Sequence, residues 1–323
     1  MSLQTDILGQ TACGVVFPGQ GAQRPGMARD FYEAFSEARL AFEEASEACS
    51  LDLARLCFEE SERLGLTEYA QPAILTAEIA MFRVVQKEAG LRPDYFGGHS
   101  LGEYTALVAA GVLGFSSAVR IVRQRGRLMQ EAVPEGRGGM VAVVGGRLDR
   151  HAVFRALDGL EVAVSNDNSP SQIVLSGLRP SLEEARRRIA TIFGGREALR
   201  TVWLDVSAPF HCELMRPVEL PLQEILEREA KVESLAAAEH VTSNYTGTWH
   251  QGDRSLLMRN LARQAVATVR WRDNMDALAS VCGRIVEIGP SAPLRGLFEN
   301  IGVPVRSITG LRALERLKEE RPH

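Results

Sequence analysis

The sequence predicts an α/β protein of two units, a large unit with a parallel sheet and a smaller unit inserted into it. Three observations lead to this fold class. Short apolar strands alternate with helical segments on both sides of the middle of the chain, as in a parallel-sheet core. The middle of the chain has its own regular order of strands and helices. A glycine-rich pentapeptide falls where one strand should turn into a helix. Strands of the large unit are expected near Val15, Phe96, Val241 and Ile285.

The first predicted strand, Cys13 to Phe17, is apolar and breaks into the loop Pro18-Gly19-Gln20-Gly21. Glycines on both sides of Gln20 let the main chain approach a ligand closely and point an N–H group at it. An oxyanion hole requires such a group. The same loop is also compatible with a plain turn, so its function depends on the rest of the site.

The pentapeptide Gly98-His99-Ser100-Leu101-Gly102 lies between the extended segment Asp94 to Gly97 and a predicted helix from Glu103 to Ala110. G-x-S-x-G at a strand-to-helix turn is typical of a nucleophile elbow, in which a sharp turn exposes the serine hydroxyl at the edge of the sheet. Ser100 is therefore the candidate nucleophile. Because the pattern also arises by chance in a glycine-rich chain, the surrounding sequence has to decide.

An amphipathic helix is predicted from Ser116 to Glu131, with Ser116 or Ser117 as its N-cap. Three of its arginines fall on the polar face, whereas Arg125 falls on the apolar face at helical spacing. A buried guanidinium needs a partner, because an unpaired buried charge is strongly destabilising. An internal carboxylate or an anionic ligand could supply it. The helix by itself favours the internal salt bridge.

The inserted unit is expected at residues 139–205, between residues 1–138 and 206–323 of the large unit. The predicted order is strand 140–145, helix 149–157, strand 161–165, strand 172–176, helix 181–193 and strand 200–205. This β-α-β-β-α-β order is the ferredoxin-like motif. We therefore expect a hydrolase-like parallel-sheet catalytic domain with an inserted ferredoxin-like domain, and an active site in the cleft between them.

Among the six histidines, His211 is the best candidate for a general base. It follows a predicted strand, and its place after Ser100 matches the order of hydrolase-type sheets. His99 is a poor base for its own neighbour, because adjacent side chains on a tight turn diverge. Asp205 could orient His211, but only six residues separate the two. The remaining histidines lie in polar sequence and are expected to be solvated: His151, His240, His250 and His323.

Composition favours a soluble cytoplasmic enzyme. The chain has 323 residues, 45% of them hydrophobic, and a formal net charge of −4, which gives no reason to expect nucleic-acid binding. No apolar run reaches the ~18 residues of a membrane span, and no secretory signal is expected. The five cysteines have no ligand spacing and are interpreted as reduced cytosolic thiols; no metal site is expected.

Several motifs together carry a family resemblance. They are Val16-Phe17-Pro18-Gly19-Gln20-Gly21, Gly98-His99-Ser100-Leu101-Gly102-Glu103-Tyr104, Gln124-Arg125-Gly126, Asn168-Ser169-Pro170 and Ile288-Gly289-Pro290. From Val15 to about Phe298 the chain resembles the malonyl-CoA:acyl carrier protein transacylase family, the freestanding acyltransferases of fatty acid and polyketide synthesis.

The resemblance implies that a malonyl group moves from coenzyme A to the phosphopantetheine thiol of an acyl carrier protein, through a malonyl-serine intermediate. It implies no bound cofactor, and we expect a monomer. The site residues that it implies are the nucleophile Ser100, the base His211, the carboxylate-binding Arg125, the oxyanion-hole residues Gln20 and Leu101, and Gln264, whose main-chain carbonyl orients the histidine. Asp205 then has no catalytic task.

Phe210 bears on the choice of acyl group. A Phe-His pair resembles the malonyl-selective pattern of modular polyketide acyltransferases, and its ring would fill the space that an α-methyl group needs. Ala208 and Pro209 match neither modular pattern. Two alternatives stay open, an acyl-carrier-protein acyl hydrolase and a transacylase for a substituted malonyl unit. The hydrolase would use Ser100 and His211 but has no need of Arg125.

Overall fold

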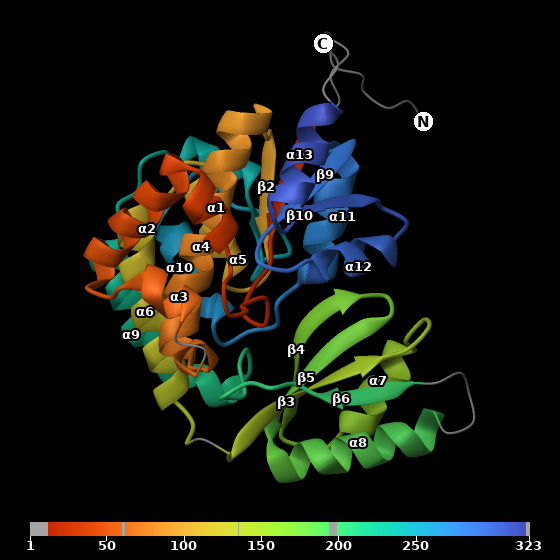
Figure 1. Ribbon diagram of the computed structural model, residues 1–323. Coiled ribbons are helices and arrows are strands. Elements are labelled where there is room, and N and C mark those ends of the chain that lie inside the picture. Colours follow the sequence, from red (N-terminus) through yellow and green to blue (C-terminus); the bar gives the residue numbers. More distant parts are fainter. Residues whose placement is uncertain (1–11, 60–61, 135, 194–198, 321–323) are drawn as a thin grey trace.

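The computed structural model describes residues 12–59, 62–134, 136–193 and 199–320. The chain folds into a large unit and a small unit that lies against one end of it, at the bottom of the view in Figure 1. None of the helices within these residues is long and apolar enough to cross a membrane.

The large unit is built on a four-stranded parallel sheet with the strand order β10-β9-β1-β2. Its strands are β1 (Cys13–Phe17), β2 (Tyr95–Gly98), β9 (Arg284–Ile288) and β10 (Val305–Ile308). Three of the expected strands are therefore present. Near Val241 there is only a single parallel bridge to Phe96, followed by the two-residue strands β7 (Thr242–Ser243) and β8 (Thr248–Trp249).

Helices cover both faces of this sheet, which explains why the inner strand β1 is apolar and buried along its whole length. Val15 and Phe17 of β1 belong to the large core with α4, whereas Val16 between them packs on the other face with α11 and α12. The helices are α1 (Arg29–Ala34), α2 (Ser36–Cys49), α3 (Leu53–Phe58), α4 (Thr67–Ala89), α5 (Gly102–Ala109), α6 (Phe115–Glu131), α9 (Arg216–Glu229), α10 (Arg254–Gln264), α11 (Trp271–Val281), α12 (Pro293–Glu299) and α13 (Leu311–Glu319).

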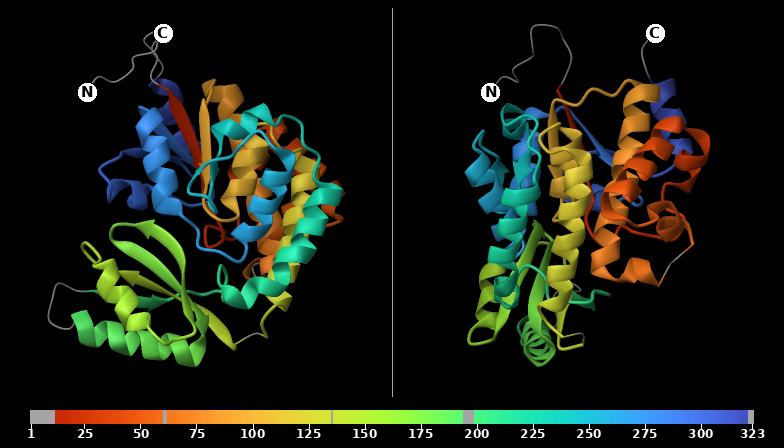
Figure 2. Two further views of the ribbon diagram at one scale, coloured as in Figure 1. Left: turned by 180° about the vertical axis from the view of Figure 1, so that it is seen from behind. Right: turned by 90° about the vertical axis from the view of Figure 1, so that its left-hand side faces the viewer.

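Helix α6 runs beside α9 down one side of the large unit toward the small unit (Figure 2). Its predicted N-cap is wrong. Gly114 is the N-cap residue, and Ser117 lies inside the helix, where its hydroxyl donates to the Gly114 carbonyl at 2.8 Å. After α6 ends, the chain crosses to the first strand of the small unit (Figure 1).

The small unit has the predicted β-α-β-β-α-β order and an antiparallel sheet with the strand order β4-β5-β3-β6. Its elements are β3 (Gly138–Val144), α7 (Arg150–Leu157), β4 (Val162–Ser169), β5 (Gln172–Leu178), α8 (Arg179–Phe193) and β6 (Arg200–Trp203). Val141 and Val143 point into a core with α7 and α8, whereas Met140 and Ala142 between them belong to the core of the large unit. The predicted fold class is confirmed.

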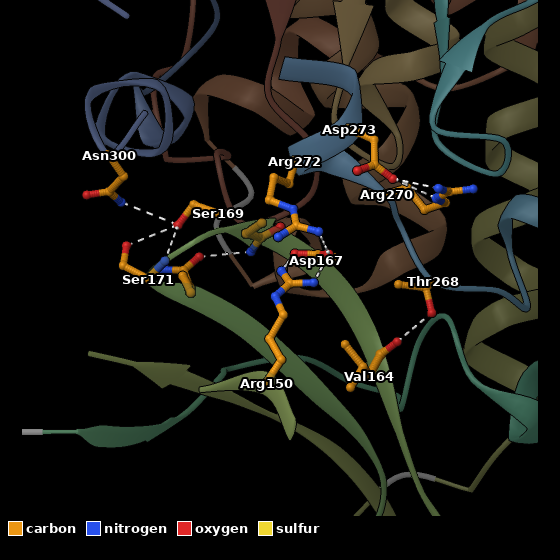
Figure 3. A network of polar contacts seen from close by, with 12 residues as sticks. Arg150, Val164, Asp167, Ser169, Ser171, Thr268, Arg270, Arg272, Asp273 and Asn300 are labelled. Carbon is orange, nitrogen blue, oxygen red and sulfur yellow. Dashed lines mark hydrogen bonds and ion pairs between the residues drawn. The ribbon is translucent and has the colours of Figure 1, made fainter. Parts of the chain in front are cut away.

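A seam of polar contacts joins β4 to the segment 268–273 of the large unit (Figure 3). Two main-chain hydrogen bonds cross it, from the Val269 amide to the Ser165 carbonyl at 2.8 Å and from the Asp167 amide to the Val269 carbonyl at 2.9 Å. The Asp167 carboxylate lies between Arg150 of α7 and Arg272 of α11 and pairs with both. The small unit is therefore fastened along β4 as well as by its two chain crossings.

Candidate active site

Ser100 sits on the turn between β2 and α5, and close packing explains the two glycines around it. A Cβ atom on Gly98 would lie 1.9 Å from the Gly102 main chain, and one on Gly102 would lie 2.2 Å from the Phe17 carbonyl oxygen. No larger residue fits at either position. Ser100 itself has φ of +52°, in the left-handed region that side-chain-bearing residues rarely adopt. The predicted elbow is thus a strained turn held between a strand and a helix.

His211 lies against Ser100 although 111 residues separate the two. The Ser100 Oγ and the His211 Nε2 are 2.7 Å apart, and the His211 Nδ1 is 2.7 Å from the Gln264 main-chain carbonyl. Since a carbonyl can only accept, Nδ1 carries the proton and Nε2 is free to accept from the serine hydroxyl. Burial, with the nearby Arg125 charge as the second cause, lowers the pKa of His211 to about 3. The imidazole is therefore neutral at ordinary pH.

The other candidates for a base or an orienting acid lie elsewhere. Asp205 is exposed, and the carbonyl of Gln264 occupies the place beside His211 where an acid would stand. The His99 Nε2 lies 2.8 Å from the Asn168 Oδ1 of the small unit, so the partner of His99 is Asn168 and not the serine. His151 and His240 are exposed as expected, and His323 lies outside the described residues.

The prediction that His250 is solvated is wrong. Its side chain is buried, with 2% exposure, and its Nε2 lies 2.8 Å from the Glu103 carboxylate. The residues next to it in the sequence are polar, but its hydrogen-bond partner lies in α5, 147 residues earlier in the chain. Local sequence carries no signal for such a long-range contact.

Arg125 is the charged group of the site. Only 1% of it is exposed, and its Nη2 lies 3.4 Å from the Ser100 Oγ. Its Nη1 and Nη2 donate to the side-chain oxygens of Gln71 and Gln264, both at 2.8 Å. Among the residues that the structure describes, Arg125 forms no ion pair with a carboxylate. The internal salt bridge favoured by the helix alone is therefore not formed, and neutral amides hold the guanidinium beside the serine.

Ser100, His211 and Arg125 open into a cavity of about 330 Å³ between the two units. The large unit contributes Gln20, Leu101 and Phe210 to its wall, and the small unit contributes a surface of apolar and amide side chains in equal number. The small-unit residues are Met140, Ala142, Asn166, Asn168, Gln172 and Val174. All the predicted site residues except Gln264 line this cavity, and Gln264 lies directly behind its wall.

Sequence reasoning missed three polar residues around the serine. They are Gln71 of α4, Glu103 in the first turn of α5, and Asn244, which follows β7. All three are buried. Gln71 and Asn244 reach the site through hydrogen bonds to Arg125 and Ser100, which lie 54 and 144 residues away in the sequence. Glu103 lies only three residues after the serine, but it accepts a hydrogen bond from the main chain of Asn244, 141 residues away. Glu103 is within the quoted motif, so its burial could have been suspected. Nothing in the local sequence singles out Gln71 or Asn244.

The fold and this site define a serine-dependent acyl-transfer enzyme. The model of the acyl transferase domain family matches residues 15–294. The malonyl CoA-acyl carrier protein transacylase of Bacillus subtilis strain 168 is 37% identical over 319 residues, which cover 94% of this chain and 97% of that protein. The protein of the same name from Escherichia coli K12 is 38% identical over 297 residues, covering 90% and 93%.

Solved structures agree with these sequence matches. The malonyl CoA-acyl carrier protein transacylase of Coxiella burnetii superposes with a TM-score of 0.88 at 32% identity, covering 97% of this chain and 98% of that one. A malonyl-transacylase solved in complex with a type II PKS acyl-carrier protein superposes with a TM-score of 0.87 at 35% identity, covering 96% and 100%. The chain belongs to the malonyl CoA-acyl carrier protein transacylase family.

Proposed function

We propose that this chain transfers a malonyl group from coenzyme A to the phosphopantetheine thiol of an acyl carrier protein, in fatty acid or polyketide synthesis. It needs no bound cofactor for this reaction. The observation that carries the proposal is the buried Arg125 guanidinium, which lies beside the Ser100 hydroxyl and is held by amide oxygens rather than by a carboxylate. A carboxylate-bearing acyl group supplies the direct ion-pair partner that Arg125 does not have among the described residues.

In the first step the neutral His211 accepts the Ser100 proton through Nε2 as the serine oxygen attacks the malonyl thioester. The Gln264 carbonyl holds the ring through Nδ1 and stabilises the imidazolium as it forms. The tetrahedral intermediate collapses, the malonyl-serine ester remains, and coenzyme A leaves as the thiol with the proton from His211.

In the second step the carrier-protein thiol gives its proton to His211 and attacks the malonyl-serine ester, so that the malonyl thioester forms and the serine hydroxyl is restored. In both steps the oxyanion is stabilised by the main-chain N–H groups of Gln20 and Leu101. Leu101 is the N-cap residue of α5, so its amide stands at the positive end of the helix dipole. Arg125 pairs with the malonyl carboxylate and fixes the acyl chain for both attacks.

The test compares malonyl-CoA with acetyl-CoA, which lacks the carboxylate. In the parent chain malonyl-CoA should add one malonyl mass, and Ser100→Ala should abolish this adduct. Arg125→Ala should lower kcat/KM for malonyl transfer roughly 100- to 1000-fold, because about 3 to 4 kcal/mol of charge pairing is lost. Acetyl transfer should change little.

Arg123→Ala is the matched control, since Arg123 lies on the same helix but donates to the Cys49 carbonyl and the Glu68 carboxylate. It should leave the malonyl-to-acetyl ratio unchanged. Equal losses of malonyl and acetyl transfer in Arg125→Ala, together with a lower melting temperature, would give Arg125 a structural role only. Malonyl-serine that is hydrolysed at the same rate with and without a carrier protein would instead favour the acyl hydrolase.

We place the enzyme in the cytoplasm. The five cysteines are free thiols, as expected in a reducing compartment.

A further inference from the structure

Glu103 is a fully buried carboxylate that the proposed mechanism does not use. It lies in the first turn of α5, directly behind the serine, with 0% exposure. One carboxylate oxygen accepts from the Gln264 side-chain amide at 2.9 Å and from the Asn244 main-chain N–H at 3.1 Å. The other lies 2.8 Å from the His250 Nε2. Three residues of the segment 244–264, at least 141 residues after Glu103 in the sequence, thus meet on its side chain.

Two of these partners hold the main chain of Ser100. The Ser100 N–H donates to the Asn244 Oδ1 at 2.6 Å, and the Ser100 carbonyl accepts from the Gln264 Nε2 at 2.7 Å. The Asn244 amide also donates to the Gly98 carbonyl at 2.8 Å. Both peptide groups of the nucleophile are therefore held by side-chain amides, and both amide residues are anchored on Glu103.

This arrangement matters because Ser100 has a positive φ. The left-handed conformation is unfavourable for a residue with a side chain and persists only where the surroundings enforce it. An amide side chain can rotate and exchange its oxygen for its nitrogen. Since the Glu103 carboxylate only accepts, it fixes the Gln264 Nε2 toward itself and Ser100, and the Gln264 oxygen toward Arg125.

We propose that Glu103 is a positioning residue, which holds the Ser100 main chain in its reactive conformation through Gln264 and Asn244. The proposal rests on the proposed function only in taking Ser100 as the nucleophile. Its action depends on an acceptor oxygen at the right place and not on negative charge as such.

Three substitutions separate position from charge. Glu103→Gln keeps an acceptor oxygen within reach of Gln264 and Asn244. Its new NH2 group would face the His250 Nε2, which can accept if the ring proton moves to Nδ1, an atom with no hydrogen-bond partner among the described residues. Glu103→Asp keeps the charge but withdraws the oxygens by one methylene. Glu103→Ala removes both.

The measurement is the second-order rate at which a neutral fluorophosphonate modifies Ser100, followed by intact-protein mass and peptide mapping. This probe has no carboxylate, so its rate does not depend on Arg125 or on the acyl specificity. We expect a loss of about 100-fold for Glu103→Ala and about tenfold for Glu103→Asp. Glu103→Gln should stay within about threefold of the parent chain.

Glu78→Ala is the matched control. Glu78 of α4 is also fully buried, and its carboxylate accepts from the Thr105 hydroxyl of the same helix α5 at 2.6 Å, but within the described part of the chain it forms no hydrogen bond to the serine. We expect this variant to lose stability and to keep the parent rate of Ser100 modification when both are measured well below the melting temperature.

The order of the Gln and Asp variants decides the proposal even if Glu103→Ala does not fold. The proposal is overturned if Ser100 is labelled at least as fast in Glu103→Asp as in Glu103→Gln, or if Glu103→Ala and Glu103→Asp both keep the parent rate. An equal loss of labelling rate in Glu78→Ala would also overturn it. A parent chain whose Ser100 is not labelled would overturn both this proposal and the proposed function. Normal labelling of the parent without malonyl transfer would overturn the proposed function alone.

Discussion

At the scale of single residues, His211 shows how the surroundings prepare a catalytic group before substrate arrives. Its ring is removed from water, and the Arg125 cation stands nearby, so the charged imidazolium is disfavoured and the pKa falls from 6.5 to about 3. The hydrogen bond to the Gln264 carbonyl works in the opposite direction but fixes which nitrogen carries the proton. Together these contacts keep the nitrogen that faces Ser100 unprotonated.

The first prediction concerns the pH dependence of Ser100 acylation. With an ordinary histidine the rate would fall as the pH drops through 6.5. Because His211 stays neutral far below that value, we expect the single-turnover rate of acylation by malonyl-CoA to be flat from about pH 8 to about pH 5. The rate is measured by intact-protein mass after rapid quenching. An inflection near 6.5 would show that the ring titrates normally.

The same shift carries a stability effect of definite sign. The pKa is lower in the folded chain than in the unfolded chain, so between about 3 and 6.5 the unfolded chain binds more protons. Above pH 6.5, His211 should therefore contribute no pH dependence to the free energy of unfolding. Below pH 6.5, its protonation in the unfolded chain should lower the free energy of unfolding as the pH falls. His211→Gln, which cannot take up this proton, should show a weaker decrease in urea unfolding experiments.

The second prediction concerns Phe210, which is buried, lines the cavity and precedes the base His211. Phe210→Ser should open space for an α-methyl group and shift the ratio of methylmalonyl to malonyl transfer by about 1 to 2 kcal/mol, or roughly five- to thirtyfold. Competition between the two CoA thioesters, read by the mass of the acyl-serine, gives this ratio directly. An unchanged ratio would mean that another part of the wall sets the selectivity.

Residue types and motif spacing predicted Ser100, His211 and Arg125, because a nucleophile on a sharp turn and a cation on an apolar helix face are visible in the sequence. The residues around them could not be predicted in the same way. Asn244 and His250 are buried because the segment that carries them packs against α5, and Gln71 belongs to a helix that is buried along most of its length. Polar residues in such places depend on tertiary contacts that no local pattern records.

At the scale of elements, the site depends on how closely α5 approaches the end of β1. The Gly102 main chain, at the start of α5, packs on the carbonyl oxygens of Phe17 and Pro18. This contact brings the predicted oxyanion loop next to the elbow.

The boundaries of most helices and strands were predicted from the sequence to within a few residues. Strand β10, with the sequence Val-Arg-Ser-Ile, was missed because a four-residue strand with a polar centre gives no clear alternation.

The third prediction tests this approach. In Gly102→Ala the new Cβ would lie 2.2 Å from the Phe17 oxygen and 2.6 Å from the Pro18 oxygen, so either the helix or the loop must move. We expect a loss of about 2 to 3 kcal/mol in the free energy of unfolding and a large loss of Ser100 reactivity. Urea unfolding measures the first quantity.

Gly296→Ala serves as the control, because Gly296 lies in helix α12 and a Cβ there would meet no atom within 4 Å. It should be neutral or slightly stabilising, since alanine favours helix more than glycine does. Similar stabilities for the Gly102 and Gly296 variants would show that α5 can shift without loss.

At the scale of the whole molecule, the cavity exists only because the two units stay together. Its walls come from both, and the Asn168 side chain of β4 reaches across to the His99 ring beside the nucleophile. The small unit joins the large unit through two chain crossings and through the seam along β4 (Figure 3). A change at the seam should therefore act on substrate binding without touching the catalytic residues.

The last prediction concerns Asp167→Ala, which removes the carboxylate shared by Arg150 and Arg272 and leaves the main-chain bonds of the seam in place. These side chains are partly exposed, so we expect a loss of about 1 kcal/mol at most. That loss should raise KM for malonyl-CoA up to about fivefold while kcat changes little, because Ser100 and His211 belong to the large unit. Faster amide hydrogen exchange at residues 167 and 269 should accompany it.

The matched control is Glu184→Ala, which removes a carboxylate paired with Arg187 and Arg188 on α8, within the small unit and away from the seam. It should leave KM and the exchange of the Asp167 and Val269 amides unchanged. If Asp167→Ala lowered kcat and left KM and amide exchange as in the parent, the seam would not control the cavity. The contact between Asn168 and His99 would then be the connection between the units that matters for the reaction.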